Sequence, residues 1–406
     1  MKHVCIKQAL DSIDFLENLL KKKSEFQLKT IQDFKNISSY LQLFEAWRSV
    51  EMAIIPNFKP VESVPVKDET CNQLSIIDGF VSHYKADKDF HMSILSPNEC
   101  SDEISTGLTR SVYSYINSLL CQNVLLIEIP ENCDAGHIQL PIICSGNFEF
   151  SYPRVLIKLA KSAKAVLSLT HEQNQVNNHS FTNVFIDIVL DEKATLQCDC
   201  IDASLSTGLI ETIQIKQAKE SVFNFNSLSY SNRFVRRDIQ VAVNGLNCVT
   251  EVAGIALLQD SQVLSQCVNL DHYFPNCQGK QIFKSILSDK SFLDSSGLVT
   301  IYPKAHNCVS TQSNPNLLLS DSARVVSRPQ LRIEADDVDC GHGSTIGQLN
   351  EEEILYFLSR GISRQDAFKY LLKGFVMDVI NRFDKKNQKS SLVECMLDIL
   401  GTYNGQ

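Results

Sequence analysis

Val184-Phe185-Ile186-Asp187-Ile188-Val189-Leu190 and, after a short break, Thr195-Leu196-Gln197-Cys198-Asp199-Cys200 are short runs rich in β-branched and alternating apolar residues. Such runs, bounded by turn residues, are typical of β-strands. The same pattern recurs at 212–216, 221–225 and 238–243. Strands come roughly every ten residues from about 120 to 340, which predicts a long all-β region. Periodicity alone leaves a sandwich, a barrel and a β-helix open, because all three use short regular strands.

Helical patterns precede this region. Residues 1 to about 55 carry apolar side chains at helical spacing, and a second helix is expected over 30–47, with Trp47 as a packing anchor. From about Pro60 the runs become short and β-branched. The sequence therefore predicts three parts: an N-terminal helical region at 1–60, a β-rich core at 61–345 and a C-terminal helical domain at 346–406.

The C-terminal domain is expected to begin with a helical hairpin. Asn350 followed by Glu353 resembles a capping box, and Gly361 is suited to end the first helix. Ser363 with Asp366 then opens a second helix. The apolar stripes of the two helices either pack on the β region or hold a partner protein, and the pattern leaves both possibilities open.

The composition is that of a globular protein. The chain has 406 residues, 44% of them hydrophobic and 21% charged, and its net charge is −9. A negative charge argues against nucleic acid as the main partner, since phosphate binding needs a basic face. No apolar window is long enough to predict a membrane span. The N-terminus has neither a signal-peptide core nor a transit peptide's lack of acids, so we expect a cytoplasmic location.

The 14 cysteines include no Cys-x-x-Cys pair, and we expect them to be reduced. Cys198 and Cys200 would share a face of a strand, where either metal binding or core packing suits them; core packing is the expectation. His272 and Cys277 are likewise interpreted as structural. No clustered carboxylate pair is evident in the β region, and no phosphate-binding loop or dinucleotide fingerprint is present, so no bound nucleotide is expected.

One stretch near the end of the β region can bind metal. Cys340 and His342 are separated by Gly341 and preceded by Asp336, Asp337 and Asp339. Thiols and imidazoles are the best ligands for soft and borderline metals, and residues i and i+2 of a strand point to the same face. Two ligands do not complete a structural site, so others come from elsewhere in the chain or from a partner. The alternative interpretation is a turn with a buried thiol and a hydrogen-bonded imidazole.

These residues are part of a wider resemblance to the SufD family of iron–sulfur assembly proteins. The strongest stretch runs from Pro329 to Gly361 and includes Cys340-Gly341-His342-Gly343. Further similar segments are Gln312–Ser320, Asp271–Cys277, Arg236–Asp238, Phe181–Asn183, Pro153–Arg154 and Glu45–Arg48. The chain departs from the family at Gly341, where serine is usual, and at His306, where glutamine is more common. On a strand, Gly341 faces away from the ligand pair.

The resemblance implies a mainly β protein with a right-handed parallel β-helix between N-terminal and C-terminal α-helical domains. It implies a scaffold that is not an enzyme, that pairs with SufB and that binds the ATPase SufC through its C-terminal helices. Cys340 and His342 would then hold transient iron or a nascent iron–sulfur cluster shared with SufB, and ATP hydrolysis would belong to SufC. A homodimer of the isolated chain stays open. The alternatives are a β-helix carbohydrate-active enzyme and a stand-alone iron-binding protein.

Overall fold

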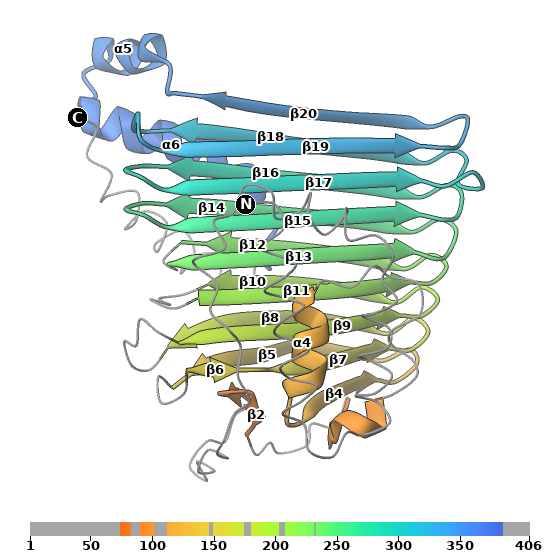
Figure 1. The fold of residues 1–406 in the computed structure, drawn as a ribbon. Helices are drawn as coiled ribbons and strands as arrows, with labels where there is room; N and C mark the ends of the chain where they lie inside the picture. Colours follow the sequence, from red (N-terminus) through yellow and green to blue (C-terminus); the bar gives the residue numbers. More distant parts are fainter. Residues whose placement is uncertain are drawn as a thin grey trace, which may run out of the picture.

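The computed structural model describes residues 74–82, 90–100, 112–145, 149–173, 180–202, 208–230 and 233–384. Within them, two long sheets face each other, and the chain passes from one to the other in every turn (Figure 1). Successive strands of each sheet pair in parallel, which makes a parallel β-solenoid of about seven turns. The predicted mainly β class and parallel β-helix are confirmed. The helices expected over residues 1–55, with Trp47, lie outside the described residues.

The strands of the first sheet share the side of the solenoid that the C-terminal helices cover. They are β2 (Phe80–Val81), β1 (Ile76–Ile77), β5 (Asp134–Cys144), β8 (Lys164–Gln173), β10 (Thr195–Asp202), β12 (Val222–Ser229), β14 (Val249–Leu258), β16 (Gln278–Leu287), β18 (Val309–Leu318) and β20 (Asp339–Gly347), in that spatial order.

The strands of the second sheet alternate with these along the chain. They are β19 (Arg324–Ile333), β17 (Phe292–Ile301), β15 (Val263–His272), β13 (Phe234–Val243), β11 (Gly208–Gln217), β9 (Phe181–Leu190), β7 (Arg154–Leu159), β4 (Val124–Ile129) and β3 (His91–Leu95), while β6 (Phe150–Ser151) pairs with β9.

Inward-facing side chains form columns, because strands of neighbouring turns pair residue for residue. One column rises through Leu196, Phe223, Thr250, Gly279 and Ser310. It begins with large apolar side chains and ends with small or polar ones. Along this column the interior therefore changes from apolar in the middle turns to more polar toward the C-terminal end.

A tight corner recurs once per turn just before the strands of the first sheet. At each corner one residue takes a left-handed conformation, as Asn247 (φ 59°), Asn276 (φ 58°) and Asn307 (φ 56°) do. Asparagine tolerates this conformation better than most residues. The Asn276 N–H donates to His306 O of the next turn at 2.9 Å, and the other two asparagines repeat this bond. The corners therefore stack in register along the solenoid.

The two ends of the solenoid differ. At the N-terminal end, β2 pairs antiparallel with β1 and β3 pairs antiparallel with β4, so each sheet ends there in a short antiparallel strand. At the C-terminal end, the order of each sheet stops at β20 and β19, and no described strand pairs with their outer edges. Unpaired edges expose backbone N–H and C=O groups that can accept another chain.

Helix α4 (Val112–Leu120), which the sequence pattern did not predict, lies on the outer face of the second sheet (Figure 1). It follows the 3₁₀ turn Pro97–Cys100 along the chain, after an interval that is not described. Tyr113, Ile116 and Leu120 lie at helical spacing and pack on aromatic side chains of the strands beneath. The strands beneath α4 are therefore buried on their outer face as well as on their inner face.

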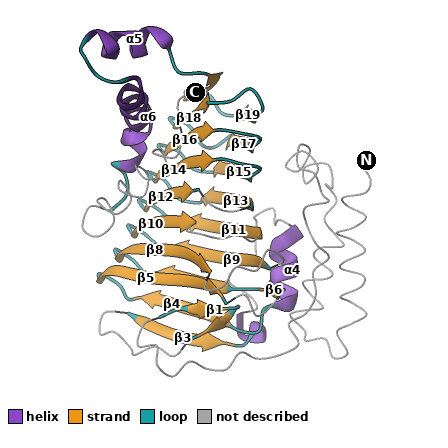
Figure 2. Ribbon diagram, turned by 90° about the vertical axis from the view of Figure 1, so that its left-hand side faces the viewer, coloured by secondary structure: helices purple, strands orange, loops and turns teal. Residues whose placement is uncertain are grey.

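The predicted helical hairpin is confirmed as α5 (Glu351–Ser359) and α6 (Arg364–Ile380). The Asn350 side chain accepts the N–H of Glu352, Gly361 has φ 78°, and the Ser363 hydroxyl accepts the Asp366 N–H. Figure 2 shows α6 beside the first sheet and α5 beyond the last strands. No helix of the described chain is long and apolar enough to cross a membrane.

The sequence left open whether the apolar stripes of these helices pack on the β region or hold a partner protein. The two helices differ in this respect. The buried side of α6 packs on β12, β14 and β16 through Leu372, Val376, Val379 and Ile380. On α5 only Ile354 is buried. Leu355 is 59% exposed and Tyr356 60% exposed. The first helix therefore has an uncovered apolar face, whereas the second anchors the hairpin to the solenoid.

Candidate functional site

Cys340 and His342 lie on β20, the last strand of the first sheet. Cys340 pairs with Ser310 of β18, and His342 pairs with Gln312. Ser310 and Gln312 are buried while the residues between and beside them are exposed, so this row faces the solenoid interior. Cys340 and His342 continue the same row in the final turn, and Gly341 faces outward as expected. The strand register therefore places both side chains on the same face, as predicted.

The pair differs in burial because no described strand forms a turn above the last one. Cys340 is half-buried and packs against the main core, whereas His342 is exposed. Burial raises the pKa of the Cys340 thiol, and the negative charges of Cys308 and Asp339 act in the same direction. Only a thiolate binds metal strongly, so an approaching cation must first displace the thiol proton. Cys340 and His342 thus place two side chains of metal-binding type at the open C-terminal end of the solenoid.

Polar side chains line the interior directly beneath this pair. Asn314 Nδ2 donates to Ser295 Oγ at 2.9 Å and to Ser327 Oγ at 3.2 Å. Ser344, two residues after His342, donates to Ser327 Oγ at 2.8 Å. The end of the solenoid therefore has a hydrogen-bonded polar interior in place of the apolar core found lower down.

His272 and Cys277, which we interpreted as structural, lie together in the upper turns. A ring nitrogen of His272 and the Sγ atoms of Cys277 and Cys308 lie within 4.8 Å of one another, and all three residues are fully buried. Burial lowers the pKa of His272 to about 4, so the imidazole is neutral. Hydrogen bonding with Cys277 lowers the pKa of Cys308 to about 7. Cys308 was not among the candidates from the sequence.

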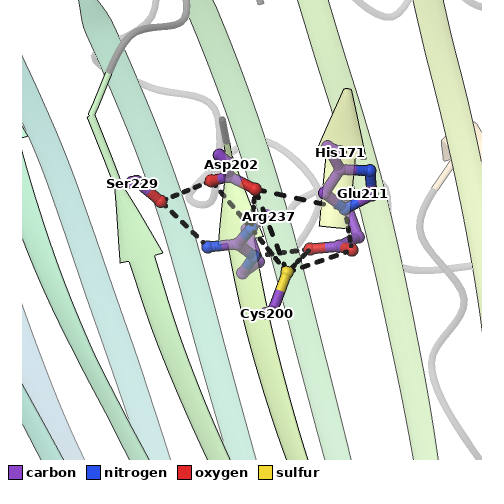
Figure 3. A network of polar contacts seen from close by, with 6 residues as sticks. All are labelled: His171, Cys200, Asp202, Glu211, Ser229 and Arg237. Carbon is purple, nitrogen blue, oxygen red and sulfur yellow. Dashed lines mark hydrogen bonds and ion pairs between the residues drawn. The ribbon is translucent and has the colours of Figure 1, made fainter. Parts of the chain in front are cut away.

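A third group is a charged network inside the middle turns (Figure 3). Arg237 Nε donates to Glu211 Oε2 at 2.5 Å, and its Nη2 donates to Asp202 Oδ1 at 2.9 Å. His171 Nε2 donates to Glu211 Oε1 at 2.8 Å. The Cys200 thiol lies against the same groups, so Cys198 and Cys200 share the inward face as predicted.

Charge balance explains how this network is stable although all of its residues are buried. Burial alone would raise the pKa of Glu211, but Arg237 and His171 outweigh it and lower the pKa of this carboxyl to about 2. Conversely, burial opposes the charge of Arg237, while Asp202 and Glu211 raise its pKa well above the ordinary value. Two carboxylates thus face one guanidinium, whose third nitrogen, Nη1, donates to Ser229 Oγ at 3.1 Å.

The expectation that the β region holds no clustered carboxylate pair was wrong. Asp202 and Glu211 converge on Arg237, although nine positions separate them in the sequence. Both carboxylates are fully buried, so a polysaccharide has no access to them. The register of neighbouring turns is the signal that finds such groups: Glu211 of β11 pairs with Arg237 of β13. That register was not available from periodicity alone.

The fold and its open end define a class of protein: a β-solenoid that presents a cysteine and a histidine on a terminal strand, beside a helical hairpin. The outer edge of that strand pairs with no described strand. Comparison with known families makes this specific. The family model described as "SUF system FeS cluster assembly, SufBD core domain" matches residues 142–375, and the chain belongs to this family. The match extends from β5 into α6 and includes all three groups of side chains described above.

Named relatives agree with the family. The iron–sulfur cluster assembly protein SufD of Escherichia coli is 29% identical over 176 residues, which is 43% of this chain and 42% of that protein. A SufBD family protein of Synechocystis is 25% identical over 300 residues, covering 71% of this chain and 66% of the relative. The chloroplastic protein ABCI7 of Arabidopsis thaliana is 25% identical over 339 residues, covering 77% and 70%. The predicted resemblance is confirmed.

Proposed function

We propose that this chain is a scaffold subunit, without a reaction of its own, in a SufB–SufC–SufD type of complex that assembles iron–sulfur clusters in the cytoplasm. Family membership and the name of the Escherichia coli relative support the assembly role. The chain spans 42% of that relative's length and 66% of the Synechocystis protein, so the division of labour among subunits is part of the proposal.

The observation that carries the proposal is the position of Cys340 and His342 on an inward-facing row of the last strand. A closed solenoid turn above them would bury both side chains. Instead the row ends here, so a second protein placed against β20 would meet both ligands. We propose that a SufB-like partner supplies the remaining ligands to iron or a nascent cluster, which satisfies the need for about four.

The unpaired edges of β19 and β20 suit that partner. Ile333 at the end of β19 is 44% exposed and Ile346 on β20 is 50% exposed. Exposed edge strands associate readily with other strands because the backbone N–H and C=O groups along their outer edge are unpaired. The N-terminal end finishes instead in the short antiparallel strands β2, of 2 residues, and β3, of 5 residues, which offer a shorter edge.

The C-terminal hairpin is the proposed binding site for a SufC-like ATPase. Leu355, Tyr356 and Tyr370 are exposed apolar or aromatic side chains that face away from the solenoid core. A groove of about 440 Å³ runs between α5, α6 and the segment after β20, and Leu349, Leu371 and Phe375 line it. Arg364 bonds Glu351 with both terminal nitrogens, at 3.0 and 2.7 Å, which holds the two helices together.

Co-purification of the three subunits tests this arrangement with two variants. Ile346→Lys places a charge on the β20 edge, and we expect it to release the SufB-like partner while the ATPase stays bound. Leu355→Glu on α5 should release the ATPase while the SufB-like partner stays. Far-UV circular dichroism checks that both variants fold.

The control is Ile94→Lys. Ile94 lies on β3 at the N-terminal end and is 54% exposed, so it matches Ile346 in residue type and exposure. This variant should retain both partners. Retention of both partners by all three variants would contradict the proposed division between the β20 edge and the hairpin.

A further inference from the structure

The corner of each turn places one small side chain into the interior, directly after the left-handed residue. In three consecutive turns that side chain is a cysteine: Cys248, Cys277 and Cys308. The residues that follow them, Val249, Gln278 and Val309, are paired across β14, β16 and β18. The three thiols therefore lie one above another along the solenoid axis. Earlier turns have Cys133, Ala163, Ala194 and Ser221 at the same corner.

His272 lies beside this row, with an aliphatic residue directly below it and another directly above it in its own column. It ends β15 and pairs with Val243 of the turn below and Ile301 of the turn above. Its side chain is 0% exposed, and neither ring nitrogen has a hydrogen-bond partner among the described residues. Buried polar groups are nearly always hydrogen-bonded, so an unpartnered imidazole needs a ligand to explain it.

The space around His272 is kept open by the absence of a side chain at Gly279. A Cβ atom at this position would lie 2.8 Å from His272 Nε2 and 2.6 Å from Ser310 Oγ. The Ser310 hydroxyl is also buried without a hydrogen-bond partner in the described chain. Two orphaned polar atoms thus face the same glycine, and the thiols of Cys277 and Cys308 lie next to them.

We propose that His272, Cys277 and Cys308 form a resident binding site for a thiophilic divalent metal ion of the zinc and ferrous class. Their ligand atoms lie within 4.8 Å of one another, while ligands of a tetrahedral zinc ion are about 3.7 Å apart, so small side-chain shifts close the site. The thiols now donate to backbone carbonyls, Cys277 to Gly245 O and Cys308 to Phe274 O. Metal binding replaces both thiol protons, which leave to solvent.

Charge selects the divalent class. Two thiolates and a neutral imidazole around a divalent ion make a neutral centre, which is the form that a buried, largely apolar site tolerates best. A monovalent ion with the same ligands would leave a buried negative charge. Ser310 Oγ lies where it can provide or hydrogen-bond a fourth ligand.

The charged network in the middle turns contains a similar group of side chains and can be compared with the His272 group. His171, Cys200 and Asp202 also bring ligand atoms within 4.8 Å of one another. There Arg237 already provides the positive charge and donates to Asp202 and Cys200. No cation of this chain occupies the corresponding place beside His272 in the described residues, and its nitrogens stay unpaired.

Titration with Co²⁺, a spectroscopic probe for zinc-type sites, tests the proposal on the full chain after chelation under anaerobic conditions. We expect one equivalent to bind, with a thiolate-to-cobalt charge-transfer band and the visible bands of a four-coordinate ion. His272→Val, which copies Val243 of the preceding turn, and Cys308→Ala, which copies the alanine corners, should each weaken binding at least tenfold and remove or alter the band.

Two controls separate this site from others. Cys248→Ala removes a thiol of the same row that lies outside the ligand group and should keep the spectrum. A Cys340→Ala/His342→Ala variant should also keep it, so that failure of this site and failure of the proposed terminal site are distinguishable. If a ligand variant does not fold, the wild-type chain still decides the question: Zn²⁺ should raise its thermal midpoint. Absence of stoichiometric Co²⁺ binding in the wild type, or an unchanged band in both ligand variants, would overturn the proposal.

Discussion

In the middle turns of the solenoid Arg237 is buried with both of its carboxylate partners. In the last turn, by contrast, His342 is exposed on a strand that pairs with one strand, β18, among the described residues. Both residues belong to inward-facing rows of the same architecture. What differs is whether a further turn closes over them. In closed turns the polar side chains pair with one another inside the solenoid. At the open end the polar side chains stay accessible to a ligand or a partner protein.

The two regions also differ in how much a substitution costs in folding stability. A buried ion pair is weak evidence of stability in itself, because burying the charges costs about as much as their attraction returns. Removing one partner is different, since it leaves an uncompensated charge in the core. The last turn carries no such risk, because Cys340 and His342 keep contact with solvent. Substitution of Cys340 or His342 should therefore cost little folding stability. Substitution of a single residue of the middle network should cost much more.

The largest expected effect is that of Arg237→Met. This change leaves Asp202 and Glu211 buried together without their cation, and we expect it to lower the free energy of unfolding by about 3–5 kcal/mol. Urea unfolding followed by far-UV circular dichroism measures the change. Arg332→Met, on the exposed side of β19, is the matched control and should shift stability by less than about 0.5 kcal/mol. Equal effects of the two changes would contradict the assigned importance of the middle network.

The second prediction concerns acid. Glu211 has an ordinary pKa of 4.5 when unfolded and a pKa of about 2 when folded. Its contribution to stability is therefore complete above about pH 4.5 and is lost as the pH falls toward 2, with a size of up to about 3 kcal/mol. In Glu211→Gln this part of the acid sensitivity should be missing. Identical pH profiles of wild type and variant between pH 5 and about 2 would refute the paired state of this carboxylate.

The smallest expected effect comes from comparing two cysteines. Cys200→Ala removes a fully buried thiol that accepts a contact from Arg237 and should cost about 1–3 kcal/mol. Cys340→Ala removes a half-buried thiol in the last turn and should change stability by less than about 1 kcal/mol. Thermal unfolding of the two variants side by side measures the difference. The reverse order would show that the open end is as important to folding as the core.

Much of this architecture follows from local sequence patterns. The alternating runs at 184–190 and 195–200 form β9 and β10, and the caps at Asn350 and Ser363 start the two C-terminal helices. The shared face of Cys340 and His342 follows from the period of two along a strand. These features depend on residues close together in the chain, which is why they could be predicted.

The groups that escaped prediction depend on the length of a solenoid turn. Cys277 and Cys308 are 31 residues apart, and Arg237 lies 26 residues after Glu211, so no local window contains either group. Turn length varies, and only the strand register brings these residues together. Helix α4 is a different case: Tyr113, Ile116 and Leu120 lie at helical spacing within one local window, so the sequence carried a signal that was missed.

The central claim is that the open end supplies half of a cluster site. It is tested most directly by cluster yield in the reconstituted three-subunit complex, measured by iron and sulfide content and by visible absorption. Cys340→Ala and His342→Ala should each lower the yield while the complex stays intact. Gly341→Ser, which faces outward where an added Cβ meets nothing within 4 Å, should leave the yield unchanged. Full yield from a Cys340→Ala/His342→Ala double variant would contradict the account.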